Sequence, residues 1–161
     1  MLNYTRFESP LGPIWLLGKG GRLLMVHLGE EEGFLKKAQR LGDELVESSQ
    51  GLELPLKELD LYFSKGLETF KTPIEVKGTS FGLGVLYEVK KLKWGEVSTY
   101  KAIAERLGRP RAARAVGQAL KRNPLPLFIP CHRVIGIKGG LGGYSAGLEF
   151  KIWLLKHEGV L

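Results

Sequence analysis

The one cysteine of the chain lies in the stretch NPLPLFIPCHRVI, residues 123–135, between a proline and one of just three histidines. Only a thiolate is strongly nucleophilic, and a neighbouring base or positive charge is what produces one. His132 and Arg133 follow Cys131 directly, which is the pattern of an activated nucleophile. Because neighbouring residues on a strand point to opposite faces, a Cys131–His132 pair requires a turn at this point. The alternative is that Cys131 is an inert core residue, since thiols bury readily.

Three prolines lie shortly before Cys131 in the sequence. Pro124 and Pro126 follow a helical pattern and break it, and Pro130 directly precedes Cys131. Proline fixes its own backbone and disfavours a helical conformation in the residue before it. We therefore expect an extended segment over residues 127–129 that aims the thiol rigidly.

Composition narrows the class of protein. One cysteine excludes an internal disulfide and a thiolate zinc cluster, and His27, the one histidine of the first half, has no cysteine beside it. No run approaches roughly 18 uncharged apolar residues, and the start, MLNYTRFESP, has neither a basic leader nor an apolar core. We expect a cytoplasmic protein with no membrane segment, no metal and no cofactor.

Ahead of the cysteine the sequence predicts two short helices around a tight turn. Ser98 or Thr99 can cap the first helix and Gly108 ends it, while the second begins at Arg111 and runs through Lys121. Two such helices about a glycine-containing turn are typical of a helix-turn-helix.

The second of these helices has almost no side-chain bulk. Its small residues are Ala112, Ala113, Ala115, Gly117 and Ala119. A thin helix brings its backbone close to whatever it lies against, which is either a ligand or a second helix in a core. Arg114 lies among the small residues and argues against the core, because an unpaired buried arginine is costly.

The net charge of +7 is distributed unevenly. Residues 1–80 carry 10 basic against 12 acidic side chains, and residues 81–161 carry 14 against 5. An excess of this kind in one half is typical of a protein that binds a polyanion, most often nucleic acid. A lysine-rich solvated surface is the alternative that charge by itself leaves open.

The first half of the chain reads as a small α/β unit. Residues 1–28 predict three short antiparallel strands, with turn signals between the apolar runs. Residues 31–42 and 55–67 place apolar side chains at helical spacings.

A short extended piece then leads to Thr79 and Ser80, which can cap a helix that runs to about Leu92. A chain of 161 residues can bury one good core or two small ones. We place two domains at residues 1–75 and 76–161.

Three motifs together carry a resemblance to a known family. IPCHRVIG, the following GGYSAGLEFKIWLLKHEG and the preceding GEVSTYKAIAERLGRPRAARAVGQALKRNP resemble the methylated-DNA–protein-cysteine methyltransferases, also called O6-alkylguanine-DNA alkyltransferases. The resemblance covers residues 79–159 closely and the first half only in its pattern of strands and helices. It implies an α/β (α+β) fold, with a ribonuclease-H-like N-terminal domain and a C-terminal winged helix-turn-helix domain.

The resemblance also implies a reaction. An alkyl group passes from O6-alkylguanine in DNA irreversibly to Cys131, in a single turnover, with O4-alkylthymine left open as a second substrate. His132 would remove the thiol proton through a water, Glu158 would orient His132, and Tyr100 would donate toward guanine N3. Tyrosine suits this task because it is a neutral donor at working pH.

Further residues would hold the base, as the resemblance implies. Tyr144 and Ser145 belong to a loop that covers the flipped base, with Ser145 near O6, and the carbonyls of Cys131 and Val134 would bind its exocyclic amine. Asn123 would tie the recognition helix to the active-site strand. Ala146 stands where relatives often have glycine, which puts acceptance of bulky alkyl groups in doubt.

The DNA contacts follow from the same resemblance. The thin helix would lie in the minor groove of duplex DNA, and Arg114 would fill the gap left by the rotated nucleotide. The remaining residues expected to contact DNA are Arg111, Ala112, Ala113, Lys121 and Arg122. We expect a monomer.

Two other classes of function remain to be distinguished. A binding-only relative would recognise alkylated bases without repairing them, but such relatives lack the acceptor cysteine. A winged-helix regulator or a Cys-His hydrolase would need an effector pocket or a further catalytic residue, and the sequence suggests neither beyond Glu158. Loss of methyl from DNA, once per thiol, fits only the alkyl acceptor.

Overall fold

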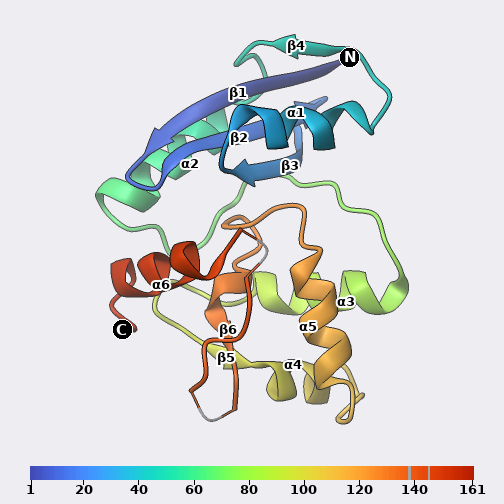
Figure 1. The fold of residues 1–161 in the computed structure, drawn as a ribbon, viewed down its shortest axis with the longest axis vertical. Coiled ribbons are helices and arrows are strands. Elements are labelled where there is room, and N and C mark those ends of the chain that lie inside the picture. The colour runs from blue at the N-terminus through green and yellow to red at the C-terminus, as the bar shows by residue number, and fades with distance from the viewer. Residues whose placement is uncertain (138, 145) are drawn as a thin grey trace. The chain divides into compact units, whose positions relative to one another are not determined.

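The computed structural model describes residues 1–137, 139–144 and 146–161. The chain forms two compact units, Met1–Val76 and Lys77–Leu161, which are described separately (Figure 1). In the described part of the chain, no helix has the length and apolar character that crossing a membrane requires.

A four-stranded sheet, in the order β3-β2-β1-β4, forms the centre of the first unit. The strands β1 (Leu2–Ser9), β2 (Gly12–Lys19) and β3 (Arg22–Leu28) are antiparallel neighbours, as the sequence predicts. The sequence did not predict β4 (Leu45–Glu47), which pairs in parallel with β1. Three residues are too few for an alternating pattern to be recognised.

Two helices cover the faces of this sheet, α1 (Glu31–Gln39) and α2 (Glu53–Ser64) (Figure 1). Residues 14–18 of β2 are all buried, as expected of a central strand covered on both sides. The core beneath α1 contains Leu2, Trp15, Leu17, Met25, Phe34 and Ala38. Both helices end a few residues before the predicted positions.

The second unit is mainly helical. A two-stranded parallel sheet pairs Ser98 with Val134 and Thr99 with Ile135, which brings the start of one helix beside the segment that follows Cys131. The elements are α3 (Ser80–Lys90), β5 (Ser98–Thr99), α4 (Tyr100–Arg106), α5 (Ala113–Lys121), the 3₁₀ turn η1 (Cys131–Arg133), β6 (Val134–Ile135) and α6 (Leu148–His157).

Side-chain caps fix two of these helices. The hydroxyl of Thr79 accepts from Gly82 N at 3.0 Å at the start of α3, and that of Thr99 accepts from Ala102 N at 3.0 Å at the start of α4. Of the two candidates at the start of α4, Thr99 is therefore the cap. α4 and α5 form the predicted helix-turn-helix, although α5 begins at Ala113, two residues later than predicted.

The predicted extended segment before Cys131 is wrong. Residues 125–129 fold back on themselves: Ile129 N donates to Leu125 O at 2.8 Å, and Leu127 has a positive φ of 75°. The side chain of Asn123 explains this path, because it accepts from Leu125 N and donates to Ile129 O, both at 3.0 Å. An amide side chain thus supplies the hydrogen bonds that an extended segment would have sought from another strand.

Candidate active site

The turn that a neighbouring cysteine and histidine require is present. Cys131, His132 and Arg133 form η1, in which Arg133 N donates to Pro130 O at 2.9 Å, and Cys131 N donates to Ile129 O at 2.7 Å. All three side chains are buried, with 4%, 0% and 1% of their surface exposed. In a single turn of this kind the thiol and the imidazole need not lie on opposite faces, as they would on a strand.

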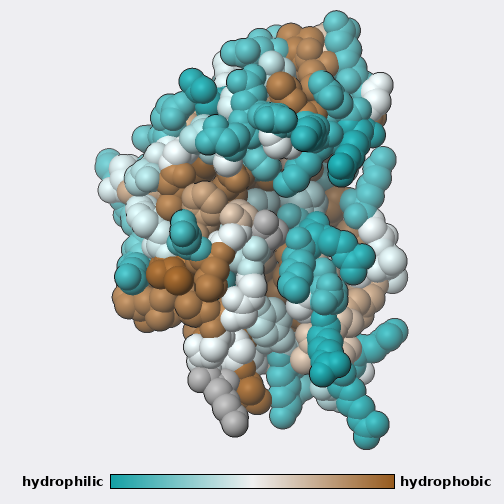
Figure 2. Space-filling model, viewed as in Figure 1, coloured by the Kyte–Doolittle hydropathy of each residue, from teal (hydrophilic) through white to brown (hydrophobic). Residues whose placement is uncertain are grey.

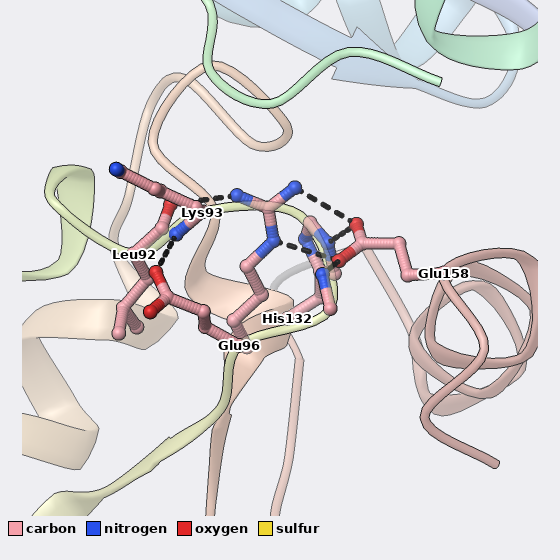
Figure 3. Close-up of polar contacts among 7 residues, drawn as sticks. Leu92, Lys93, Glu96, His132 and Glu158 are labelled. Atoms are coloured by element: carbon pink, nitrogen blue, oxygen red, sulfur yellow. Dashed lines mark hydrogen bonds and ion pairs between the residues drawn. The ribbon is translucent and has the colours of Figure 1, made fainter. Parts of the chain in front are cut away.

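A buried ion cluster fixes the imidazole. His132 Nε2 lies 2.6 Å from Glu158 Oε2, and Arg133 donates to the same carboxylate from Nε at 2.8 Å and from Nη2 at 3.0 Å. Figure 3 shows the side chains of His132 and Glu158 directed toward each other. The third guanidinium nitrogen, Nη1, donates to Leu92 O at 2.7 Å. Arg133 therefore forms an ion pair with Glu158, and the sequence did not suggest this pairing.

The loop between α3 and β5 completes this cluster. Gly95 N donates to Glu158 Oε1 at 3.1 Å, and Lys93 N donates to Glu96 Oε1 at 2.7 Å, which closes the loop (Figure 3). Glu158 thus accepts from His132, Arg133 and the backbone. A buried carboxylate with this many donors is well satisfied.

These contacts set the protonation of the pair. Burial lowers the pKa of His132, although the hydrogen bond to Glu158 acts in the opposite direction. Burial opposes ionisation of Glu158, but the hydrogen bonds from His132 and Arg133 outweigh it and hold the pKa of that carboxyl well below its usual range. At neutral pH the pair is therefore a neutral imidazole beside a carboxylate.

The tautomer of His132 follows from this arrangement. A carboxylate can only accept, so Nε2 carries the hydrogen and Nδ1 carries the lone pair. Nδ1 is buried and has no hydrogen-bond partner among the described residues. Nδ1 is therefore the ring nitrogen whose lone pair can accept a proton.

A cavity of about 370 Å³ opens on the thiol. The described residues that line it are Tyr100, Ala113, Arg114, Gly117, Gln118, Leu120, Lys121, Cys131, Gly142, Gly143 and Tyr144. Cys131 Sγ accepts a hydrogen bond from Asn123 Nδ2 at 3.1 Å, and this bond orients the thiol. Cavities of this size commonly hold small organic groups such as a single base.

Tyr100 stands at the wall of the cavity, at the first position of α4. Burial, together with negative charge on Cys131, raises the pKa of Tyr100 above its ordinary value. Its hydroxyl therefore keeps its proton and remains a hydrogen-bond donor. Gly117 lies beside the ring, and a Cβ there would lie at ordinary contact distance, 3.8 Å, from Tyr100 Cδ1.

The structure describes some of the other residues that the sequence predicts to hold the base. The ring of Tyr144 packs edge-on against His132, with centroids 6.3 Å apart. The carbonyl of Val134 already accepts from Lys151 Nζ at 2.7 Å, which leaves one lone pair for a base. Ser145 lies outside the described residues. Ala146 is half-buried, and the described cavity lining does not include it.

The residues predicted to contact DNA lie on and around α5. Arg111, Arg114, Lys121 and Arg122 are exposed, while Ala112 and Ala113 are half-buried. The surface over α5 is predominantly hydrophilic (Figure 2). Of these residues, Ala113, Arg114 and Lys121 also line the cavity, so the basic helix and the thiol share one site.

Sequence reasoning missed Lys151, a buried lysine on α6 that bonds to Val134, Gly143 and Tyr100. No local signal pointed to it, because a lysine on a helix is ordinarily solvated. Within the described ranges, no group of three or more His, Cys, Asp or Glu side chains could hold a metal ion. The absence of a metal and of a cofactor stays a prediction.

Comparisons with known proteins show the family to which the chain belongs. Residues 80–160 match the family model of the 6-O-methylguanine DNA methyltransferase DNA-binding domain, and residues 2–76 match that of its ribonuclease-like domain. A methylated-DNA–protein-cysteine methyltransferase of Saccharolobus islandicus is 50% identical over 161 residues, covering 99% of this chain and 97% of the relative. One of Methanosarcina acetivorans is 40% identical over 158 residues, covering 98% and 99%.

A solved structure is also similar over nearly the full length. The Mycobacterium tuberculosis OGT in complex with DNA superposes with a TM-score of 0.85 at 33% identity, covering 97% of this chain and 92% of that one. The expected fold class, a ribonuclease-like α/β domain followed by a helical DNA-binding domain, is thereby confirmed. With both family models matched in order along the chain, the protein belongs to the 6-O-methylguanine DNA methyltransferase family.

Proposed function

We propose that this protein repairs O6-alkylguanine in DNA by transferring the alkyl group to Sγ of Cys131, once per molecule. One observation carries the proposal: the buried thiol opens on a cavity next to a neutral imidazole whose Nε2 is held by a carboxylate. Membership of a methyltransferase family that acts on 6-O-methylguanine supports it. The proposed reaction requires no metal and no cofactor.

The proposed reaction is a single displacement at the alkyl carbon. His132 Nδ1 takes the thiol proton through one water, and the thiolate attacks the alkyl carbon. The bond between that carbon and O6 breaks as the bond to sulfur forms, so guanine leaves as an anion. Tyr100, held protonated by its raised pKa, donates a hydrogen bond toward N3 and disperses the charge.

The proposed reaction stops after one turnover. The product is a thioether, and a water activated by His132 would have to displace sulfur from an unactivated alkyl carbon. Among the described residues, no group of three or more His, Cys, Asp or Glu side chains could hold a metal ion to assist the departing sulfur. The alkylated protein is therefore the end product.

We further propose that the substrate is duplex DNA approached from the minor groove, and that the protein acts as a cytoplasmic monomer. A solved relative, the M. tuberculosis OGT, is described in complex with DNA. A base stacked in a duplex cannot be attacked in line by sulfur, so it must rotate out of the helix. The small side chains of α5 suit a narrow groove, and the exposed arginines around it suit phosphates.

The direct test is an incubation of the protein with a duplex that contains O6-methylguanine. Loss of methyl from the DNA with appearance of methyl on Cys131 would support the proposal. Unchanged O6-methylguanine after prolonged incubation with equimolar protein would contradict it. An unrelated base modification in the same duplex serves as the control substrate.

Replacing Arg114 with alanine should slow repair of duplex DNA much more than reaction with the free modified base. Arg114 is exposed, lines the cavity and would stabilise the rotated nucleotide. Unstacking a base costs a few kcal/mol, so we expect a loss of roughly 10- to 100-fold on duplex. Single-turnover rates on the two substrates measure this difference.

Arg111→Ala is the matched control, since it removes the same charge at an exposed position that is not part of the described cavity lining. It should weaken binding to damaged and undamaged duplex alike. If Arg114→Ala slowed both substrates by the same factor, its proposed role in holding the rotated state would be excluded.

A further inference from the structure

Gln118 lies on the rim of the cavity, between two cationic side chains. Arg114, Gln118 and Lys121 are four and three residues apart on α5, and this spacing places them in one row on the helix surface. All three side chains are exposed, and all three line the cavity that opens on the thiol. This outer row therefore borders the mouth of the cavity.

The neighbouring row of α5 faces the inside of the cavity. Its members also follow one another at four and three residues, and they are Ala113, Gly117 and Leu120. Ala113 is half-buried and Leu120 is buried, and a Cβ on Gly117 would lie 3.8 Å from the ring of Tyr100. The inner row borders the space in which a rotated base would lie. The outer row is left to contact the part of a duplex that stays outside the cavity.

Gln118 differs chemically from its two neighbours in the outer row. Arginine and lysine side chains can only donate hydrogen bonds, whereas an amide has a carbonyl acceptor and an NH₂ donor. The structure describes all nine residues of α5, and Gln118 is the one whose side chain carries an acceptor. It is therefore the side chain of this helix that can accept a hydrogen bond from DNA.

The minor groove offers one group that only an acceptor can recognise. Every base pair presents acceptors there, and a G·C pair adds a single donor, the N2 amino group of guanine. The side-chain oxygen of a glutamine can accept from N2 while its NH₂ group donates to N3 of the same guanine. Adenine presents N3 without the amino group and can make only the second of these bonds. A glutamine in the minor groove is therefore fitted to guanine.

The position of Gln118 on α5 limits which base pair it can reach. Four residues of α-helix rise about 6 Å, and successive base pairs are about 3.4 Å apart. In the proposed complex α5 lies in the groove and Arg114 fills the gap left by the rotated nucleotide. Gln118 is then one or two base pairs away from that gap, on one side of it.

We propose that Gln118 is a specificity-determining residue that recognises the minor-groove edge of a guanine beside the modified nucleotide. Alkyl transfer is accordingly faster where a G·C pair lies within two base pairs of O6-alkylguanine, on the side that Gln118 faces. This inference rests on the proposed function and deepens it, because it adds a sequence preference to the recognition of the duplex.

Inosine in place of a flanking guanine provides the test, because inosine keeps N3 and lacks the N2 amino group. Second-order rate constants of methyl transfer are measured on O6-methylguanine duplexes. Each of the two base pairs on either side is made G·C or inosine·C in turn, in both orientations. For the wild type, inosine at a position on one side should lower the rate constant by roughly fivefold or more.

Gln118→Met keeps the length of the side chain and removes both of its hydrogen-bonding groups, so this difference should disappear. Inosine also weakens its own base pair, which eases rotation of a neighbouring nucleotide. That effect is the same for both proteins, so the guanine-to-inosine rate ratios of the wild type and the variant are compared. Equal ratios in the two proteins at every position would overturn the proposal.

Two control variants separate base recognition from general binding. Lys121→Met, in the same row, should slow transfer from all duplexes by a common factor, because an ammonium cannot accept from N2. If it removed the guanine-to-inosine difference, the assignment to Gln118 would be wrong. Gln39→Met makes the same chemical change at an exposed position of α1 and should alter neither the rate nor the ratio.

The two proposals can fail in distinguishable ways. Absence of methyl transfer from every duplex by the wild type would contradict the proposed function, and the sequence preference with it. Methyl transfer with a ratio that Gln118→Met leaves unchanged would contradict only the role of Gln118. Melting temperatures of all variants identify losses of rate that come from unfolding.

Discussion

Cys131→Ser is expected to transfer no detectable methyl from DNA while it still binds the duplex. Serine keeps a small polar group that can accept from Asn123 Nδ2, as the thiol does at 3.1 Å, so the turn should stay folded. Its hydroxyl has a far higher pKa than a thiol and is not a comparable nucleophile. The measurement is a single-turnover assay with O6-methylguanine duplex, together with a binding titration on the same duplex.

A residual rate in Cys131→Ser comparable with that of the wild type would show that another group accepts the alkyl. Weak binding together with lost transfer would point to unfolding, which a melting curve detects. Retained binding with lost transfer is the pattern that an acceptor cysteine requires.

Glu158→Gln is expected to lower both stability and rate. The carboxylate pairs with Arg133 and holds His132, and all three side chains are buried. An amide would leave the guanidinium buried without its counter-charge, and removing one partner of a buried pair typically costs about 3–5 kcal/mol. The amide would also hold the His132 tautomer less firmly, and weakened proton transfer typically costs roughly 100-fold in rate. Chemical denaturation and single-turnover kinetics measure the two effects.

The pH dependence of this variant has a definite sign. In the folded protein, hydrogen bonds from His132 and Arg133 hold the pKa of Glu158 below its usual range. The carboxylate therefore contributes stability above the ordinary glutamate pKa of about 4.3, and this contribution is lost as the pH falls toward the folded value. The stability difference between wild type and Glu158→Gln should shrink in acid. Glu149→Gln, at an exposed position of α6, the helix that Glu158 directly follows, is the control and should show little difference at any pH.

Local patterns predicted much of the fold. The strand alternation, the Thr99 cap and the glycine-ended helix are properties of a few consecutive residues, so the sequence displays them directly. The pairing of His132 with Glu158 was predicted only because the motifs resemble a known family. Spacing on its own does not bring together two residues 26 positions apart.

Other features depend on contacts that no local pattern encodes. Lys151 reads as an ordinary helix lysine, and its burial appears only when the chain brings Val134, Gly143 and Tyr100 around it. The prolines before Cys131 suggested an extended path, but the side chain of Asn123 folds the segment back. In both cases the tertiary structure brings a polar side chain to its hydrogen-bond partners. Helix and strand propensities contain no information about such contacts.

The central claim is that Cys131 is consumed as a stoichiometric alkyl acceptor, and a titration followed by mass spectrometry tests it most directly. A fixed amount of protein is mixed with increasing O6-methylguanine duplex, and the intact mass and the peptide that contains Cys131 are measured. We expect one added CH₂ on that peptide, complete at one equivalent of duplex, with no further repair when more duplex is added. Repair of several equivalents per protein, or an unmodified Cys131 after repair, would contradict the account.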